Sequence, residues 1–494
     1  MLCGDRALIA ELDVVPSFTQ LYRALTRLRP SASGRVPSFS ASGSALVVSS
    51  FSLVASRRSC TPRLLLVVPV ATSALLLLGG RALEWPARIA LIALGAAAAI
   101  ALARRTDVPI RSAVVAVALA MTLATAVAPQ GSGDVWSYEM YGRMVVDHHV
   151  SPFTHVPSQF KSDPFERRVS STWRHTPSVY GPAFVVLASV GAAVAGSSAL
   201  IARLWFQLLA ALALGSILVL VWRHTRRAGA VAALGLHPLV VLALVNAGKN
   251  DLLVGLAVLA AVIAARSRHP VVGGLAIGVG TLVKVTCGLA LIGLAPFTWR
   301  QRGRRDALQL LTTATATVAF GCIGSGLTPF AATRSNATLI SRASPWQLAR
   351  LGFGFNEPLH PWTHLPAHAV LAIVSFAGTA GVVVLALAAA QARRGDRDAA
   401  VATGGALAAY SVAAPYALAA YAAWWLPMTV LTPTRRSSVF LTWYAVVALA
   451  CYQVPHRLLA DADTPWSIAV TYAVPIVAVV LFVRHVVRER AVGA

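Results

Sequence analysis

Charged side chains are scarce in this chain. Only 12% of its 494 residues are Asp, Glu, Lys or Arg, whereas soluble domains carry roughly 25%. Hydrophobic residues make up 57% of the chain, and the mean hydropathy is +0.68. This composition excludes a water-soluble globular enzyme, and the same apolar content excludes a disordered chain.

Motifs for metals and nucleotides are lacking as well. The five cysteines are scattered without a CxxC pair, so neither a disulfide framework nor a zinc site is indicated. The chain has no phosphate-binding Gly-rich loop ending in Gly-Lys-Ser/Thr and no HExxH motif. An enzyme of this kind must take an activated substrate from the bilayer or from outside the cell. We expect no cofactor, and we favour no metal because the outward acids form no tight cluster.

Acidic residues are rarer than basic ones, at 18 against 42. In a soluble protein this excess would suggest a nucleic-acid partner. Here the cations stand in short clusters between apolar runs, as at Arg104-Arg105, Arg226-Arg227 and Arg302 to Arg305. That is the positive-inside pattern of membrane proteins. We therefore expect membrane lipid, and no nucleic acid, as a partner.

Apolar runs recur from about residue 64 to residue 483 and predict an all-α polytopic membrane protein with about 11 to 14 membrane segments. Residues 1–62, rich in Ser, Arg and Pro, are expected to form a disordered basic N-terminal extension. We expect residues 63–485 to form the transmembrane domain and residues 486–494 a cytoplasmic tail. The arginine clusters place the loops 130–178 and 327–364 outside a plasma membrane.

Two runs do not fit a simple succession of spans. The run 271–297 is too long for one helix and holds Lys284 in its middle, so we expect two half-spans that enter and return on one side. If the runs 179–197 and 200–221 both crossed, the basic loop 222–227 would lie outside. One of these two runs therefore does not cross completely.

Asp134 follows the run 110–129 and precedes a helical pattern. In a helix, Asp134, Tyr138 and Tyr141 share one face. A carboxylate at the outer membrane boundary can accept a proton from an acceptor hydroxyl. The alternative is that Asp134 caps the helix, since Asp is a preferred N-cap residue.

Further polar residues near the predicted outer surface are candidates for substrate binding. Arg143 can clamp a phosphate or pair with Glu139 one turn earlier. His175 and Tyr180 can hydrogen-bond a sugar or a phosphate, although a lone His is more often a residue of an internal interface.

A second polar group interrupts the apolar runs. Lys249 can serve as a phosphate counter-ion while Asn250 and Asp251 position the ligand, or the three can form a polar turn with Asp251 as helix cap. Lys284 can snorkel to the headgroups or contact a lipid phosphate. The aromatic group around Tyr421 and Trp424 fits an interfacial belt, or a surface that stacks a sugar or prenyl chain.

Several of these residues occur in an order that resembles a known family. The series is Asp134-x3-Tyr138-x2-Tyr141-Gly-Arg143, Ser151-Pro-Phe153, Tyr180-Gly-Pro182, Asn250-Asp251-x-Leu and Leu282-Val-Lys284. It resembles the GT-C glycosyltransferases over about residues 64 to 485. The closest resemblance is to the actinobacterial mannosyltransferases that use polyprenyl-phosphate-mannose, including the alpha-1,6 and family 87 enzymes.

The resemblance implies a GT-C-type helical bundle with a large first extracytoplasmic loop. It implies an inverting transfer of mannose from a polyprenyl-phosphate donor to a glycan or glycolipid acceptor. The base would be Asp134, and Arg143, Lys249 and Lys284 would meet the donor phosphate. Two other classes remain open: a transporter or flippase of lipid-linked sugars, and a non-catalytic scaffold for envelope synthesis.

Overall fold

The computed structural model describes residues 62–326, 366–392, 398–416, 418–432 and 436–453, with a few residues between 328 and 346. The expected extension before Pro62, the tail 486–494, the apolar run 466–483 and most of the loop 327–364 lie outside the described residues.

All secondary-structure elements among the described residues are helical, as predicted. The first group is α3 (Pro62–Gly79), η2 (Gly80–Ala82), α4 (Trp85–Arg104) and α5 (Ile110–Ala126). The next is α6 (Asp134–Val146), η3 (Pro157–Gln159), η4 (Glu166–Arg168), α7 (Ser171–Arg174) and α8 (Pro182–Ala195). There follow α9 (Ala199–Thr225), α10 (Ala228–Gly235), η5 (Leu239–Asn246), α11 (Asp251–Arg266), α12 (Pro270–Val283), η6 (Val285–Leu289), α13 (Ala290–Arg302) and α14 (Arg304–Gly321). The last are α17 (Ala367–Ala392), α18 (Ala399–Ala413), η8 (Ala419–Trp424), α19 (Leu426–Leu431) and α20 (Arg436–Cys451).

Three of these helices, α3, α4 and α9, are long and apolar enough to cross a membrane. The pair α10 and η5 passes the same test together but is bent by 57°. Other apolar helices, such as α5 and α12, have 10–17 residues. The chain is therefore an all-α membrane protein, while the total of about 11 to 14 segments stays a prediction.

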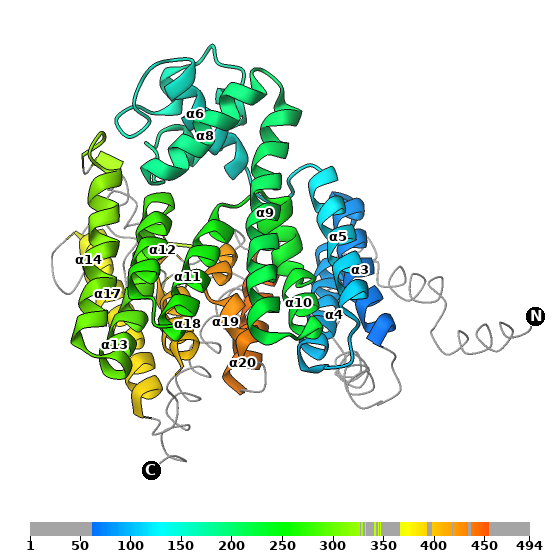
Figure 1. The fold of residues 1–494 in the computed structure, drawn as a ribbon. Coiled ribbons are helices and arrows are strands. Elements are labelled where there is room, and N and C mark those ends of the chain that lie inside the picture. The colour runs from blue at the N-terminus through cyan, green and yellow to red at the C-terminus, as the bar shows by residue number, and fades with distance from the viewer. Residues whose placement is uncertain are drawn as a thin grey trace, which may run out of the picture. The chain divides into compact units, whose positions relative to one another are not determined.

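Helices α6 and α8 pack against each other above the main bundle (Figure 1). Gly142 of α6 lies so close to α8 that a Cβ there would stand 2.2 Å from the Ala188 carbonyl oxygen. We call residues 134–195 the cap. Because α8 belongs to the cap and the 27-residue α9 runs the length of the bundle, α8 is the run that need not cross. This arrangement removes the conflict over the basic loop 222–227.

The expected break at Lys284 is present. Helix α12 ends at Val283, and α13 begins after the short η6 and runs back toward the start of α12. The Arg302 guanidinium at the end of α13 donates to the Arg266 carbonyl oxygen, 3.0 Å away, at the end of α11. The two half-helices thus return to the end from which they started, with Lys284 at their tip.

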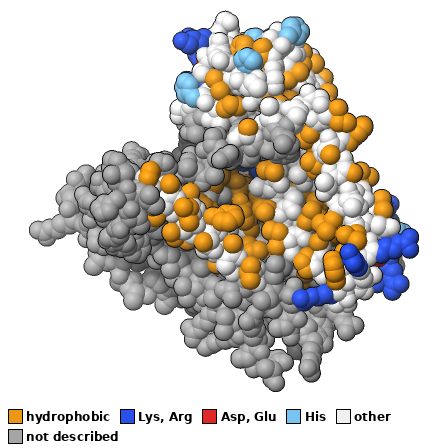
Figure 2. All heavy atoms as spheres, turned by 90° about the vertical axis from the view of Figure 1, so that its left-hand side faces the viewer, with side chains coloured by type: hydrophobic (Ala, Val, Ile, Leu, Met, Phe, Trp, Pro, Cys, Tyr) orange, Lys and Arg blue, Asp and Glu red, His pale blue; other side chains and the backbone are white. Residues whose placement is uncertain are grey.

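The two ends of the bundle differ in charge. The cap loop 130–178 holds five acidic and five basic residues. The opposite end is formed by the loops 104–109, 222–228, 266–269 and 300–306, which hold eleven arginines and two aspartates. The Arg227 side chain donates to the Ala103 carbonyl oxygen at 2.6 Å, which joins the loop 222–228 to the last turn of α4. Figure 2 shows most lysine and arginine side chains of one face at this lower end and hydrophobic side chains across the middle.

Candidate active site

Side chains from distant helices hold the segment that precedes Asp134. The last carbonyl groups of an α-helix have no partner within the helix. Asn246, the last residue of η5, donates to two carbonyl oxygens at the end of α5, those of Ala124 at 2.9 Å and Val127 at 3.0 Å. Gln207 of α9 donates to the same two oxygens at 3.2 and 3.0 Å. Both side chains are fully buried, so the start of α6 has a fixed position.

These positioning residues were not among the predicted site residues. Gln207 and Arg203 are polar residues in the otherwise apolar run 200–221. This interruption is the only feature of the sequence that could have marked them as functional. Arg203 donates to the carbonyl oxygens of Thr125 at 2.9 Å and Ala126 at 3.1 Å. The partners lie 77 and 78 positions away in the sequence, so spacing could not reveal them.

Asp134 is the first residue of α6, and Gly133 is the helix cap. The alternative prediction, that Asp134 is the cap residue, is therefore wrong. Its carboxylate forms an ion pair with the Lys249 ammonium instead. The exposed fraction of the side chain is 20% for Asp134 and 11% for Lys249. The carboxylate is thus sheltered but still reached by solvent.

The pKa of Asp134 reflects two opposed effects. Burial by itself would raise the pKa, because it penalises the charged form. The ammonium of Lys249, and more weakly that of Lys284, holds the pKa below its ordinary value. Asp134 is therefore ionised at neutral pH.

Lys249 reaches Asp134 from a tight turn between η5 and α11. Gly248 has a φ of +60°, and a Cβ at this position would lie 2.7 Å from the Val135 side chain and 3.2 Å from that of Phe206. Glycine meets both requirements, since it adopts positive φ without strain and has no Cβ. The turn therefore packs directly against the first turn of α6 and carries the ammonium to the carboxylate.

Asp251, two positions after Lys249, forms a second lysine–aspartate pair with Lys284. The Lys284 ammonium is 2.8 Å from an oxygen of Asp251, and the Trp424 indole donates to the same oxygen at 2.8 Å. Asn250, not Asp251, precedes α11 as its cap residue, so the prediction of Asp251 as helix cap is wrong. Asp251 is 2% exposed, and such a buried charge needs the partners that it has here.

The aromatic group does not form an interfacial belt. Trp424 and Trp425 are 0% and 1% exposed. The Lys284 ammonium lies 5.0 Å from the Tyr421 ring centre and 5.5 Å from that of Trp424. A cation at this distance from an aromatic face is stabilised by the ring. The group therefore surrounds Lys284 in the interior.

Tyr138 joins the cap to this region. Its hydroxyl lies 3.5 Å from the Asn250 side-chain oxygen, and its ring packs edge-on against Tyr180 at 5.0 Å and Phe184 at 4.7 Å. The Asn250 amide nitrogen is buried and has no hydrogen-bond acceptor within the described part of the chain. Gly181, beside Tyr180, donates its backbone N–H to the Val283 carbonyl oxygen at 3.0 Å. The Tyr180-Gly-Pro182 motif thus lies against the break that carries Lys284.

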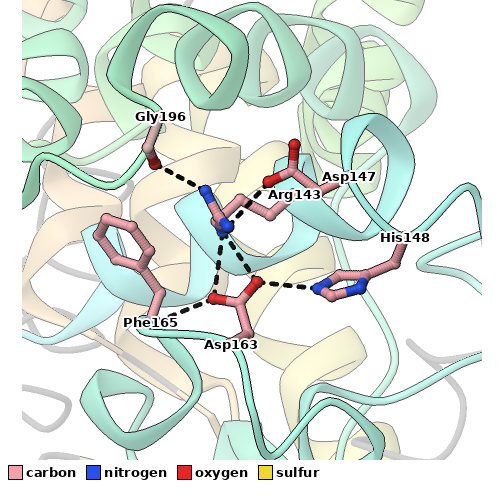
Figure 3. A network of polar contacts seen from close by, with 6 residues as sticks. All are labelled: Arg143, Asp147, His148, Asp163, Phe165 and Gly196. Carbon is pink, nitrogen blue, oxygen red and sulfur yellow. Dashed lines mark hydrogen bonds and ion pairs between the residues drawn. The ribbon is translucent and has the colours of Figure 1, made fainter.

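Arg143 belongs to a different cluster of the cap, drawn in Figure 3. Its Nε donates to Asp163 at 2.9 Å, its Nη1 donates to the Gly196 carbonyl oxygen at 2.6 Å, and its Nη2 lies 2.8 Å from Asp147. His148 is 2.8 Å from Asp163. The alternative pairing with Glu139 is absent. Arg143 lies nine positions after Asp134, about 13 Å along the helix. Arg143 therefore stabilises the cap at some distance from the Asp134–Lys249 pair.

Two predicted residues stand apart from the lysine–aspartate pairs. The Tyr141 hydroxyl donates to the Thr176 carbonyl oxygen at 2.9 Å. His175 is exposed, and its side chain makes no hydrogen bond with any residue that the structure describes. The structure thus brings together Asp134, Tyr138, Tyr180, Lys249, Asn250, Asp251 and Lys284, and it leaves Arg143, Tyr141 and His175 in the surrounding cap.

No three His, Cys, Asp or Glu residues in the described ranges are close enough together to hold a metal ion. Transfer without a metal stays a prediction, which the experiment below tests.

The fold and site define a helical membrane protein with a sheltered carboxylate–ammonium pair at one end of its bundle. A family model described as "Alpha-(1->6)-mannopyranosyltransferase, N-terminal domain" matches residues 43–300, which is more than half of the chain. The chain belongs to this family and is a glycosyltransferase of the alpha-mannosyltransferase type. The match confirms the resemblance and overrides the transporter and scaffold alternatives. No curated protein and no solved structure matches the chain.

Proposed function

We propose that the enzyme transfers mannose from a polyprenyl-phosphate donor to a glycan or glycolipid acceptor at the outer face of the plasma membrane. The family name suggests an alpha-1,6 linkage for the product. The observation that carries the proposal is the pairing of Asp134 with Lys249 at the cap end of the bundle. One partner can accept a proton and the other can hold an anion, which are the two functions that this transfer requires.

In the proposed reaction, Asp134 removes the proton of the acceptor hydroxyl. The acceptor oxygen attacks the anomeric carbon of mannose from the face opposite the phosphate, and a new glycosidic bond forms. The bond between the anomeric carbon and the phosphate oxygen breaks, and its electron pair leaves on polyprenyl phosphate. A beta-linked donor therefore gives an alpha-linked product.

Lys249 has two successive partners in this scheme. Before the donor binds, it neutralises Asp134. The donor phosphate then attracts the ammonium, and the carboxylate becomes a stronger base when its cation turns to the phosphate. Lys284 stands behind it, beside Asp251, and its charge also acts on Asp134. Positive charges fixed where negative charge develops are a large source of catalysis.

The charge distribution supports an active site on the outer face. Loops rich in Lys and Arg stay in the cytoplasm, and the end opposite the cap has eleven arginines against two aspartates. The cap, with its equal numbers of acids and bases, then faces outward. The donor's prenyl chain would remain in the bilayer between helices, while its phosphate and sugar meet the cap.

The test is a transfer assay in membranes that contain the full chain. Radiolabelled polyprenyl-phosphate-mannose is supplied with a panel of oligomannosides, with and without EDTA, and GDP-mannose replaces it in a control. We expect a product that alpha-mannosidase cleaves, formed in the presence of EDTA and only from the lipid donor. Transfer from GDP-mannose in membranes free of polyprenyl phosphate would contradict the proposed donor.

Sidedness needs a separate arm. A membrane-impermeant acceptor is added to sealed right-side-out vesicles and to sealed inverted vesicles that carry the labelled donor. We expect transfer in the right-side-out vesicles and little in the inverted ones. The reverse pattern would contradict the proposed outer face without affecting the assignment of the donor.

A further inference from the structure

An apolar groove runs between the N-terminal halves of α3 and α5. It encloses about 510 Å³, within the size range of small-molecule sites, roughly 300–1,000 Å³. Val67, Val115 and Leu119 line the groove and are each 58% exposed. Ala71 also lines it, and its small side chain fills little of the space. The lining runs over nine residues of each helix, about 12 Å, so the groove can hold much of one acyl chain.

Two arginines stand at one end of this groove. Arg63 and Arg111 are exposed, line the groove, and form no ion pair or hydrogen bond with any residue in the described ranges. Each belongs to the first turn of its helix, where unpaired backbone N–H groups and the helix dipole also favour an anion. Positive charge therefore gathers at the point where the apolar lining ends.

This combination of features selects the occupant. A free phosphate would gain nothing from the apolar lining, and a neutral lipid would gain nothing from the arginines. A phospholipid with a net negative charge uses both, because the planar guanidinium fork matches phosphate oxygens. Basic pockets between membrane helices commonly bind such headgroups.

We propose that the groove between α3 and α5 is a binding site for one anionic phospholipid, whose phosphate contacts Arg63 and Arg111. The site lies at the arginine-rich end of the bundle. Arg111 lies 15 positions before Ala126, the last residue of α5, so about 22 Å of helix separates the proposed phosphate contact from the segment that leads to Asp134. The site is therefore distinct from the place where the donor phosphate would react, and the proposal is independent of the sugar that the enzyme transfers.

The test measures bound lipid on the full chain purified in nanodiscs. Discs contain phosphatidylcholine alone or with phosphatidylglycerol, and native mass spectrometry counts the phosphatidylglycerol that stays with the protein. Arg63→Gln/Arg111→Gln should lower the affinity roughly thirty-fold, since each cation near an anionic headgroup contributes about 1 kcal/mol. Arg223→Gln/Arg300→Gln is the matched control, because it removes two exposed arginines from the same end outside the groove. Equal retention by both double variants would overturn the proposal.

Two further variants separate the parts of the site. Val115→Trp fills the groove without a change of charge and should also release the lipid; full retention would overturn the role of the groove. Glycerol phosphate added to wild type should not compete, and competition would assign the site to a free phosphate ester instead. Mannosyl transfer in detergent should be unchanged in every variant, which checks that each one is folded.

Crosslinking identifies the occupant in native membranes. The photoreactive residue p-benzoylphenylalanine replaces Val67, and the adduct is identified by its mass. We expect a phospholipid adduct. A crosslink to a peptide, from this chain or from a second copy, would mean that protein covers the groove and would overturn the proposal.

Discussion

The ammonium of Lys249 contacts the carboxylate of Asp134, although 115 positions separate the two residues in the sequence. The contact joins the start of the cap to the turn before α11. It gives the proposed base a cation that a negatively charged donor can draw away.

Replacement of Lys249 by Ala should move the pH dependence of transfer. Lys249 lowers the pKa of Asp134, so its loss raises that pKa, and the acid limb of the activity profile moves to higher pH. The rate at the optimum should also fall, by about tenfold or more, because the donor phosphate loses a counter-ion.

The measurement is kcat/KM for the lipid donor against pH, with Lys249→Arg as the matched control. Arginine keeps the positive charge, so its acid limb should stay close to that of wild type. An unshifted limb in Lys249→Ala would place Lys249 outside the reach of the titrating group.

Asn246 should contribute to stability through the end of α5. Asn246→Leu leaves the Gln130 backbone N–H without its acceptor, the Asn246 side-chain oxygen at 2.9 Å, and removes one of the two side-chain amides that donate to the Ala124 and Val127 carbonyl oxygens. An unmet buried polar group costs about 1–3 kcal/mol. We expect a fall of several degrees in the unfolding temperature in detergent. Ser216→Ala, which removes an exposed hydroxyl on α9, should leave that temperature within about one degree.

Asp163 should make the cap sensitive to acid. Burial opposes ionisation, but the backbone N–H of Phe165 and the side chains of His148 and Arg143 hold the pKa of Asp163 below its ordinary value. The stability that Asp163 contributes is present above the unfolded-state pKa of about 3.9 and is lost as the pH falls through the lower folded-state value.

Limited proteolysis of the loop 130–178 checks that the stability contributed by Asp163 is lost, and not gained, as the pH falls. Wild type should resist cleavage at neutral pH and become sensitive only below about pH 4, while Asp163→Asn should be cleaved already at pH 7. Asp147→Asn is the matched control, because Asp147 is 40% exposed and its pair with Arg143 should contribute little. Equal cleavage of the two variants would show that Asp163 does not hold the loop.

Glu139 should have the opposite pH dependence. It is fully buried, neither carboxylate oxygen has a hydrogen-bond partner among the described residues, and burial raises its pKa to about 7. The folded state therefore holds a proton that the unfolded state releases at about pH 4, and stability falls as the pH rises from about 4 to 7. Glu139→Gln should be close to wild type at pH 5 and more stable by a few degrees at pH 8. A constant difference across this range would contradict the buried neutral acid.

Much of the fold could be predicted because a long apolar run in a membrane protein forms a helix that lies in the bilayer. The run 200–221 became α9, and Lys284 inside the run 271–297 marked the break between α12 and α13. The identity of the partners could not be predicted in the same way. Asp163 reaches Arg143 from an irregular loop, and Trp424 meets Asp251 from 173 positions away, so only the folded chain brings them together.

Local spacing also misled in two places. An Asp before a helical pattern suggested a cap at both Asp134 and Asp251, but each carboxylate is paired with a lysine instead. The preference of Asp for a cap position is worth about 1 kcal/mol, and a sheltered ion pair between helices can outweigh it. The lysine partners lie 115 and 33 positions away from Asp134 and Asp251, so local spacing could not reveal them.

The most direct measurement is the rate of mannosyl transfer by Asp134→Asn in membranes with the lipid donor and an oligomannoside acceptor. Asn is close in size to Asp but cannot take the proton, so the rate should fall by at least about a hundredfold, while the amount of inserted protein stays the same. Asp107→Asn, at the opposite end of the bundle and paired with Arg105, should keep full activity. A rate for Asp134→Asn within about twofold of wild type would contradict Asp134 as the base.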